Sequence, residues 1–109
     1  MPERKRVFSG IQPTGHLHLG NHLGAVRNWV QQQSEHDSYF CVVDLHAMTL
    51  PWDPAELRER SVATGALLMA CGIDPSSSTL FLQSHVPAHA ELAWILSCVA
   101  RMGELRRMV

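Results

Sequence analysis

Paired cysteines, excess positive charge and long apolar runs are all missing from this sequence. Its three cysteines form no CxxC pair, and an odd, widely spaced set argues against a secreted disulfide framework. A formal net charge of −1 leaves no basic face of the kind that autonomous nucleic-acid-binding domains carry. The N-terminal MPERKRVFSG lacks the apolar core of an export signal, and no run approaches membrane-spanning length. We therefore expect a cytoplasmic protein with buried, reduced thiols.

What remains is a globular composition. Hydrophobic residues make up 46% and charged residues 17% of the 109-residue chain, which excludes disordered, collagen-like and coiled-coil classes. This length allows one small hydrophobic core. We expect a single domain over residues 1–109.

Short apolar segments alternate with segments of helical spacing. Three segments are rich in aromatic or β-branched residues and are typical of strands buried on both faces: Val7–Ser9, Tyr39–Asp44 and Thr79–Leu82. Apolar residues at helical spacing follow the first and third of these segments: Leu19, Leu23, Val26 and Val30, then Leu92, Ile95, Leu96 and Val99. This alternation predicts an α/β fold with three parallel strands.

The middle helix has clear start and stop signals. Asp53 is placed as an N-cap with Glu56 three residues later, and Pro54 occupies the first helical position. Gly72 and Pro75 follow the predicted end. The order of elements implies right-handed crossovers in a doubly wound sheet, with ligands at the C-terminal ends of the strands.

Two loops are expected at those strand ends, Gly10–Asn21 and Leu45–Pro51. The first is rich in glycine and leads into a helix, so its backbone N–H groups and the helix dipole can hold a phosphate without a large basic charge. It contains neither GxGxxG nor GxxxxGK[ST], so the dinucleotide and Walker A mechanisms do not apply. The residues of this loop that could meet a ligand are Gly10, Gln12, Gly15, His18, Gly20 and Asn21.

The loop also carries a recognisable motif. HLGN at His18–Asn21 resembles the HIGH motif of class I aminoacyl-tRNA synthetases, and its flanking residues are similar to the tryptophanyl branch, in which asparagine is usual at the fourth position. The resemblance extends from about Val7 to Met108. Its segments are GIQPTG (Gly10–Gly15), NHLGA (Asn21–Ala25), YFCVVDLHAMT (Tyr39–Thr49), GIDP (Gly72–Pro75), LFLQSHVPAHAELAW (Leu80–Trp94) and GELRRM (Gly103–Met108).

The resemblance implies a Rossmann-like fold and the ATP-dependent activation of tryptophan, followed by transfer of the aminoacyl group to its tRNA. It implies Mg²⁺ bound with the nucleotide and a homodimer in the full-length family member. By position it assigns ATP binding to Gln12, Pro13, Thr14, His18, Gly20 and Asn21, with His18 and Asn21 catalytic. Tryptophan binding is assigned to Phe8, Gly10, Val43 and His46.

The sequence ends at Val109, before the positions where this family has its KMSKS loop and anticodon-binding domain. We therefore expect residues 1–109 to be the N-terminal half of the nucleotide-binding fold, inactive or weakly active alone. If the strand order is the usual one, the first strand is an exposed edge, and we expect marginal stability or self-association. Two alternatives stay open: a truncated non-catalytic paralogue that binds nucleotide or a partner, and another nucleotidyltransferase with a HIGH motif.

Other patterns have simpler explanations. The pairs His18/His22 and His85/His89 are each one helical turn apart, but no third ligand completes either pair, so we expect no metal. We assign His85 and His89 to the turn and first helical turn after the third strand. Among the tryptophans, we expect Trp29 and Trp94 in a core or interface, and Trp52 packed under the first loop.

Overall fold

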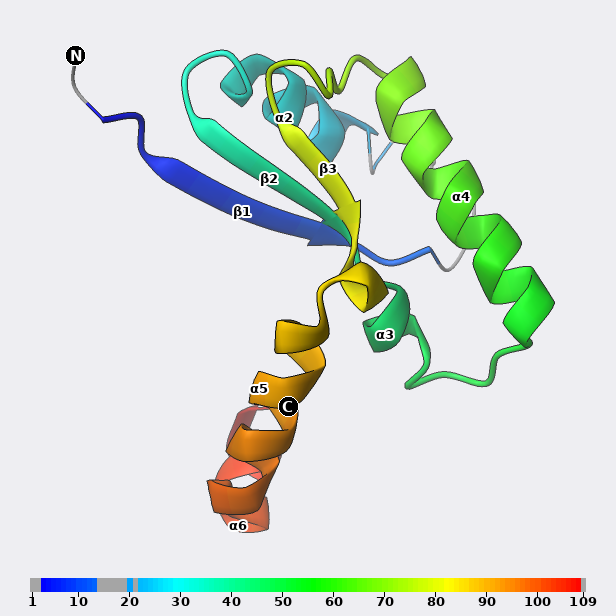
Figure 1. The fold of residues 1–109 in the computed structure, drawn as a ribbon, viewed down its shortest axis with the longest axis vertical. Helices are drawn as coiled ribbons and strands as arrows, with labels where there is room; N and C mark the ends of the chain where they lie inside the picture. The colour runs from blue at the N-terminus through cyan, green and yellow to red at the C-terminus, as the bar shows by residue number, and fades with distance from the viewer. Residues whose placement is uncertain (1–2, 14–19, 21, 109) are drawn as a thin grey trace.

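A three-stranded parallel sheet forms the centre of the protein (Figure 1). The computed structural model describes residues 3–13, 20 and 22–108. The strands are β1 (Arg6–Ile11), β2 (Asp37–Val42) and β3 (Thr79–Leu82), arranged in the order β1-β2-β3. Both pairings are parallel, as predicted, and β1 is an edge strand of this sheet.

Helices connect and follow the strands. Between β1 and β2 lie a π-helical segment, η1 (His22–Val26), and α2 (Arg27–Gln32). Between β2 and β3 lie α3 (Asp44–Ala47) and α4 (Pro54–Ala70). The elements after β3 are η2 (Gln83–His85), α5 (Pro87–Val99), α6 (Met102–Leu105) and η3 (Arg106–Met108).

One face of the sheet carries the hydrophobic core. The strand order advances in one direction, so right-handed crossovers bring α2 and α4 to the same face. Trp29 of α2 stacks on Phe40 of β2 with ring centroids 5.2 Å apart, and Leu68 of α4 joins the same cluster. The buried residues of this core are Val26, Trp29, Phe40, Val42, Leu68 and Ile73.

The sequence signals of α4 are confirmed at both ends. Oδ1 of Asp53 accepts a hydrogen bond from the backbone N–H of Glu56 at 3.0 Å, and Pro54 is the first helical residue. Gly72 follows the helix with a φ of 114°, a conformation that favours glycine over residues with a Cβ. This glycine also makes room for Val30, whose Cγ1 would lie 3.2 Å from an added Cβ.

Several predicted boundaries were wrong. The first strand was expected to end at Ser9, but β1 reaches Ile11, so Gly10, expected to begin the first loop, lies inside the strand. The second strand was expected to reach Asp44, but β2 ends at Val42 and Asp44 is the first residue of α3. The expected loop Leu45–Pro51 therefore begins inside a helix. A helix of four residues is too short to show a 3.6-residue period, so the sequence pattern could not separate it from a loop.

The C-terminal helices extend away from the sheet and from α2 and α4 (Figure 1). The predicted stripe of α5 forms, but its apolar side chains are exposed, with Trp94 72% and Val99 73% accessible. Trp94 is therefore not a core residue, whereas Trp29 is. Cys98, expected to be buried, is exposed on the same helix, while Cys41 is buried and Cys71 half-buried. In the described part of the chain, no helix has the length and apolarity needed to cross a membrane.

Candidate functional site

Three of the four positions predicted to line a tryptophan pocket come together on one face of the sheet. Side chains alternate along a strand, so Phe8 and position 10 of β1 share a face. A Cβ on Gly10 would lie 3.0 Å from Cγ1 of Val43, so the Val43 side chain extends over this glycine. These residues face away from the core of Phe40 and Val42, toward the surface that α2 and α4 do not cover.

Aromatic rings border this surface. The ring of Phe8 lies 6.3 Å from that of Phe81 on β3 and 6.3 Å from that of His89 in the first turn of α5. Phe81 and His89 are themselves 6.1 Å apart in an edge-to-face arrangement. His89 does lie in the first helical turn, as expected, but its ring contacts were not predicted. Phe81 was missed because a strand phenylalanine reads first as core.

The fourth predicted tryptophan position, His46, lies on α3 with an exposed side chain. Its backbone oxygen accepts a hydrogen bond from Oγ1 of Thr49 at 2.8 Å. This helix begins directly after Val43, whose side chain extends over Gly10. His46 therefore follows Val43 closely along the chain. The structure thus places His46 after the C-terminal end of β2, on α3 and not on the sheet itself.

The predicted ATP positions are only partly described. Gln12 is exposed and Pro13 is buried directly after β1, and Gly20 lies in a helical, exposed position. Pro13 lines a cavity of about 100 Å³ together with Trp52 and Asp53. Trp52 was expected to pack under the loop, with a pocket wall as the alternative; it lines this cavity and remains 45% exposed. Thr14, Gly15, His18 and Asn21 lie outside the described residues, as does Leu19 of the predicted helical stripe.

A carboxylate that the sequence reasoning did not single out connects two strand ends. Oδ1 of Asp44 accepts hydrogen bonds from the backbone N–H of Leu45 and of Ser84, each at 3.0 Å. Oδ2 accepts a third from the Ser84 hydroxyl. Nearby, burial and secondarily the charge of Asp44 raise the pKa of the Cys41 thiol to about 11, so this cysteine is a poor nucleophile.

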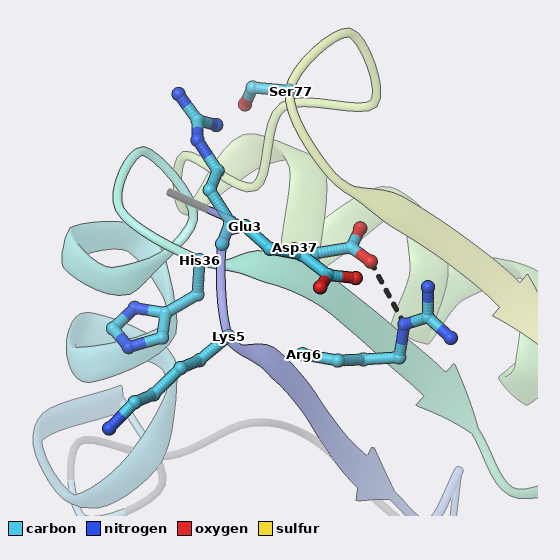
Figure 2. A pocket seen from close by; sticks show the side chains of 7 residues that line it. Glu3, Lys5, Arg6, His36, Asp37 and Ser77 are labelled. Carbon is cyan, nitrogen blue, oxygen red and sulfur yellow. Dashed lines mark hydrogen bonds and ion pairs between the residues drawn. The ribbon is translucent and has the colours of Figure 1, made fainter. Parts of the chain in front are cut away.

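The opposite edge of the sheet has an open hollow of about 650 Å³ (Figure 2). Figure 2 shows Lys5 and His36 directed to one side of β1 and Arg6 to the other. Arg6 Nε donates to Asp37 Oδ2 at 2.9 Å, and this hydrogen bond raises the pKa of Arg6. Because its charged groups have both signs and Arg6 is paired with Asp37, the hollow does not form a convergent anion site.

No three His, Cys, Asp or Glu side chains gather into a set that could hold a metal ion within residues 3–13, 20 and 22–108. At the C-terminal ends of the strands, the described residues present an apolar, aromatic surface beside the loop that follows β1. Such a surface can hold a flat apolar group while nearby backbone and polar groups orient it.

The sequence of the chain is similar to those of class I tRNA synthetases. The family model described as class I tRNA synthetases (W and Y) matches residues 2–109. The chain is 61% identical over 105 residues to the tryptophan–tRNA ligase of Gloeobacter violaceus, covering 96% of this chain and 31% of that protein. A second relative, the tryptophan–tRNA ligase of Prochlorococcus marinus, is 59% identical over 107 residues, with 98% and 32% covered.

The fold is also similar to solved structures. Tryptophanyl-tRNA synthetase from Campylobacter jejuni, complexed with ADP and tryptophan, matches with a TM-score of 0.88 and 40% identity. That match covers 94% of this chain and 32% of the solved one. The chain thus spans about a third of the length of the relatives that it matches, and its sheet is the first half of their Rossmann-like fold.

Proposed function

Since this chain belongs to the class I tRNA synthetases of the tryptophan and tyrosine family, we propose that it carries the N-terminal part of the catalytic domain of a tryptophan–tRNA ligase. In the proposed reaction, the tryptophan carboxylate attacks the α-phosphate of ATP, forming tryptophanyl-adenylate and releasing pyrophosphate. The aminoacyl group then passes to the terminal adenosine of tRNA, and AMP leaves. The sheet edge described above would bind and orient the reactants, because catalysis here is mostly positioning and charge stabilisation.

The observation that carries the proposal is the shared face of Phe8, Gly10 and Val43. Gly10 has no side chain, so a flat ring can lie against the backbone at this point. Phe8 and Val43 supply apolar walls, and aromatic rings bind indole well through offset or edge-to-face contacts. His46, on the adjacent α3, would add a polar group at the rim.

The ATP loop is proposed from position. Gln12 and Pro13 follow β1 directly, so with Thr14 and Gly20 they would lie against the nucleotide. His18 and Asn21 would donate hydrogen bonds to its phosphates at the start of the following helix, where the helix dipole favours negative charge. Mg²⁺ would accompany ATP and neutralise phosphate charge.

The partners of a whole synthetase belong to the same proposal. They are tryptophan, ATP and tRNA, with a homodimer in the cytoplasm as the working form. Residues 1–109 would then be a single partial catalytic domain.

A second candidate function is that of a non-catalytic module that pairs with an intact synthetase subunit. The exposed apolar side chains of α5 favour it: Trp94 and Val99 present surface that a partner chain could bury. Co-purification with a full-length synthetase, without pyrophosphate exchange, would support this alternative.

Tryptophan-dependent ATP–pyrophosphate exchange by the purified chain tests the main proposal, with His18→Ala as the control against contaminating host enzyme. Exchange that is lost in His18→Ala supports adenylate formation by this chain. Exchange that persists in His18→Ala reports contamination. A folded chain that gives no exchange and binds neither tryptophan nor ATP contradicts the proposal.

A further inference from the structure

Asp44 makes a link between distant parts of the chain at the edge where tryptophan is proposed to bind. Its carboxylate accepts from the Ser84 backbone N–H at 3.0 Å, from the Ser84 hydroxyl, and from the N–H of Leu45 at 3.0 Å. Asp44 and Ser84 are 40 residues apart. Hydrogen bonds to an ionised carboxylate are stronger than those between neutral groups, so both ends are held firmly.

The neighbouring residue, Val43, extends this link to the first strand, β1. The backbone N–H of Val43 donates to the carbonyl oxygen of Ile11, the last residue of β1, at 2.9 Å. Val43 is thus bound to β1 on one side, and Asp44 is bound to η2, directly after β3, on the other. The pair Val43–Asp44 ties the C-terminal ends of all three strands together.

The side chain of Val43 depends on this arrangement. Its Cγ1 lies within 3.0 Å of the position that a Cβ on Gly10 would take, so a small rotation of the Val43 backbone would move an apolar wall of the proposed pocket. The same turn starts α3, which carries His46. Asp44 itself points to Ser84 and not to the Gly10 surface, so it acts on a ligand through its neighbours.

We propose that Asp44, held by Ser84, is a positioning residue for tryptophan recognition: it fixes Val43 over Gly10 and sets the start of α3. This inference rests on the proposed function, because it presumes that tryptophan binds against Phe8, Gly10 and Val43. It predicts an effect on the affinity for tryptophan that is larger than the effect on the affinity for ATP, whose proposed contacts follow β1 at Gln12 and Pro13.

A matched side-chain link at the opposite end of the sheet provides a control. Gln33 Nε2 donates to the carbonyl oxygen of Gly72 at 2.8 Å, and Gln33 Oε1 accepts from the N–H of Asp74 at 2.8 Å. This link also joins residues far apart in sequence, but it lies beside α4 and the turn into β3. Gln33→Met removes its hydrogen bonds while keeping the approximate shape.

The experiment uses the full 109-residue chain, labelled with ¹⁵N and titrated separately with L-tryptophan and with ATP, with dissociation constants taken from amide shifts. We expect Asp44→Ala to weaken tryptophan binding about tenfold and ATP binding less than about twofold, as the loss of charge-assisted hydrogen bonds in a positioning residue implies. Ser84→Ala, which keeps the backbone donor, should weaken tryptophan binding by about threefold. Asp44→Asn, which keeps an acceptor oxygen, should recover most of the affinity.

The outcomes separate the inference from the proposed function. Wild type that binds no tryptophan overturns both. Wild type that binds tryptophan, with Ser84→Ala and a folded Asp44→Ala binding it equally well, overturns the positioning role alone. A parallel loss of tryptophan affinity in Gln33→Met, with matched loss of stability, also overturns it, since the effect would then follow global stability. If Asp44→Ala fails to fold, Ser84→Ala decides by the same criterion.

Discussion

The two faces of the sheet contain similar residues in different surroundings. Phe40 of β2 is 1% exposed against α2 and α4, whereas Phe8 of β1 is 58% exposed on the other face. The difference comes from topology: crossovers that advance in one direction put both connecting helices on the same face. The uncovered face holds the proposed tryptophan positions, so the residues that stabilise this chain and those assigned to its function lie on opposite sides.

The largest expected effect contrasts those two phenylalanines. Phe40→Ala should lower the free energy of unfolding by about 3–5 kcal/mol, because it removes a buried ring and leaves a cavity beside Trp29. Phe8→Ala should lower it by less than about 1 kcal/mol, since most of that ring is already in contact with solvent. Urea unfolding followed by circular dichroism measures both. Equal losses would mean that the second face is also covered in solution.

Self-association should depend on α5 more than on the edge strand β1. Trp94 and Ile95 are 72% and 59% exposed, and burying them against another copy would remove a large apolar surface from water. We expect the chain to associate in sedimentation velocity at micromolar concentrations. Trp94→Glu with Ile95→Glu should weaken that association by at least about tenfold.

Ser97→Glu is the matched control for this prediction, because it adds negative charge to the same exposed helix without removing apolar surface. Association that survives the double substitution at α5 would point to an unpaired edge of the sheet instead. Among residues 3–13, 20 and 22–108, β1 and β3 each pair with β2 alone, so both outer strands offer such an edge.

A smaller effect on stability is expected at the proposed pocket. Gly10→Ala puts a Cβ 3.0 Å from Cγ1 of Val43, which should cost about 1 kcal/mol of stability as the valine shifts. Tryptophan affinity should fall several-fold more than this loss alone explains, because the added methyl group takes the space proposed for the indole. Gly65→Ala is the control: nothing lies within 4 Å of its Cβ position, and alanine in α4 should stabilise the helix. Unchanged tryptophan binding in Gly10→Ala would move the pocket elsewhere.

These contrasts show which features the sequence could predict. The presence of three strands and the capping of α4 by Asp53 and Gly72 follow from local spacing and turn chemistry. The end of β1 did not, because Gly10 was expected in the loop and lies inside the strand. The link from Asp44 to Ser84 could not be predicted, because it depends on tertiary pairing across 40 residues. Neither could the exposure of Cys98, since a helical stripe gives the apolar side of α5 without saying whether anything covers it.

Part of the candidate tryptophan site could also be predicted from local spacing. Alternation along β1 is enough to put Phe8 and Gly10 on one face, and the parallel register adds Val43 at the adjacent strand end. Which face is uncovered depends on the strand order, which the resemblance supplied and periodicity alone did not. The rings of Phe81 and His89 meet Phe8 only after β3 and α5 are placed.

The smallest expected effect on the free energy of unfolding lies in the exposed turn between α4 and β3. Oδ1 of Asp74 accepts from the backbone N–H and the hydroxyl of Ser76, each at 2.8 Å, and these bonds lower the pKa of Asp74 below its usual 3.8. A lowered folded-state pKa gives stability that is present above the unfolded pKa and lost as the pH falls through the folded value.

Urea midpoints of wild type and Asp74→Asn should therefore differ slightly at neutral pH and converge below about pH 3. Ser76→Ala, which keeps the backbone donor, should give an intermediate difference. Since Asp74 is exposed at a turn, the difference should remain well below that between Phe40→Ala and wild type; a constant gap between the two curves down to the lowest pH would show that the turn is not held by the ionised carboxylate.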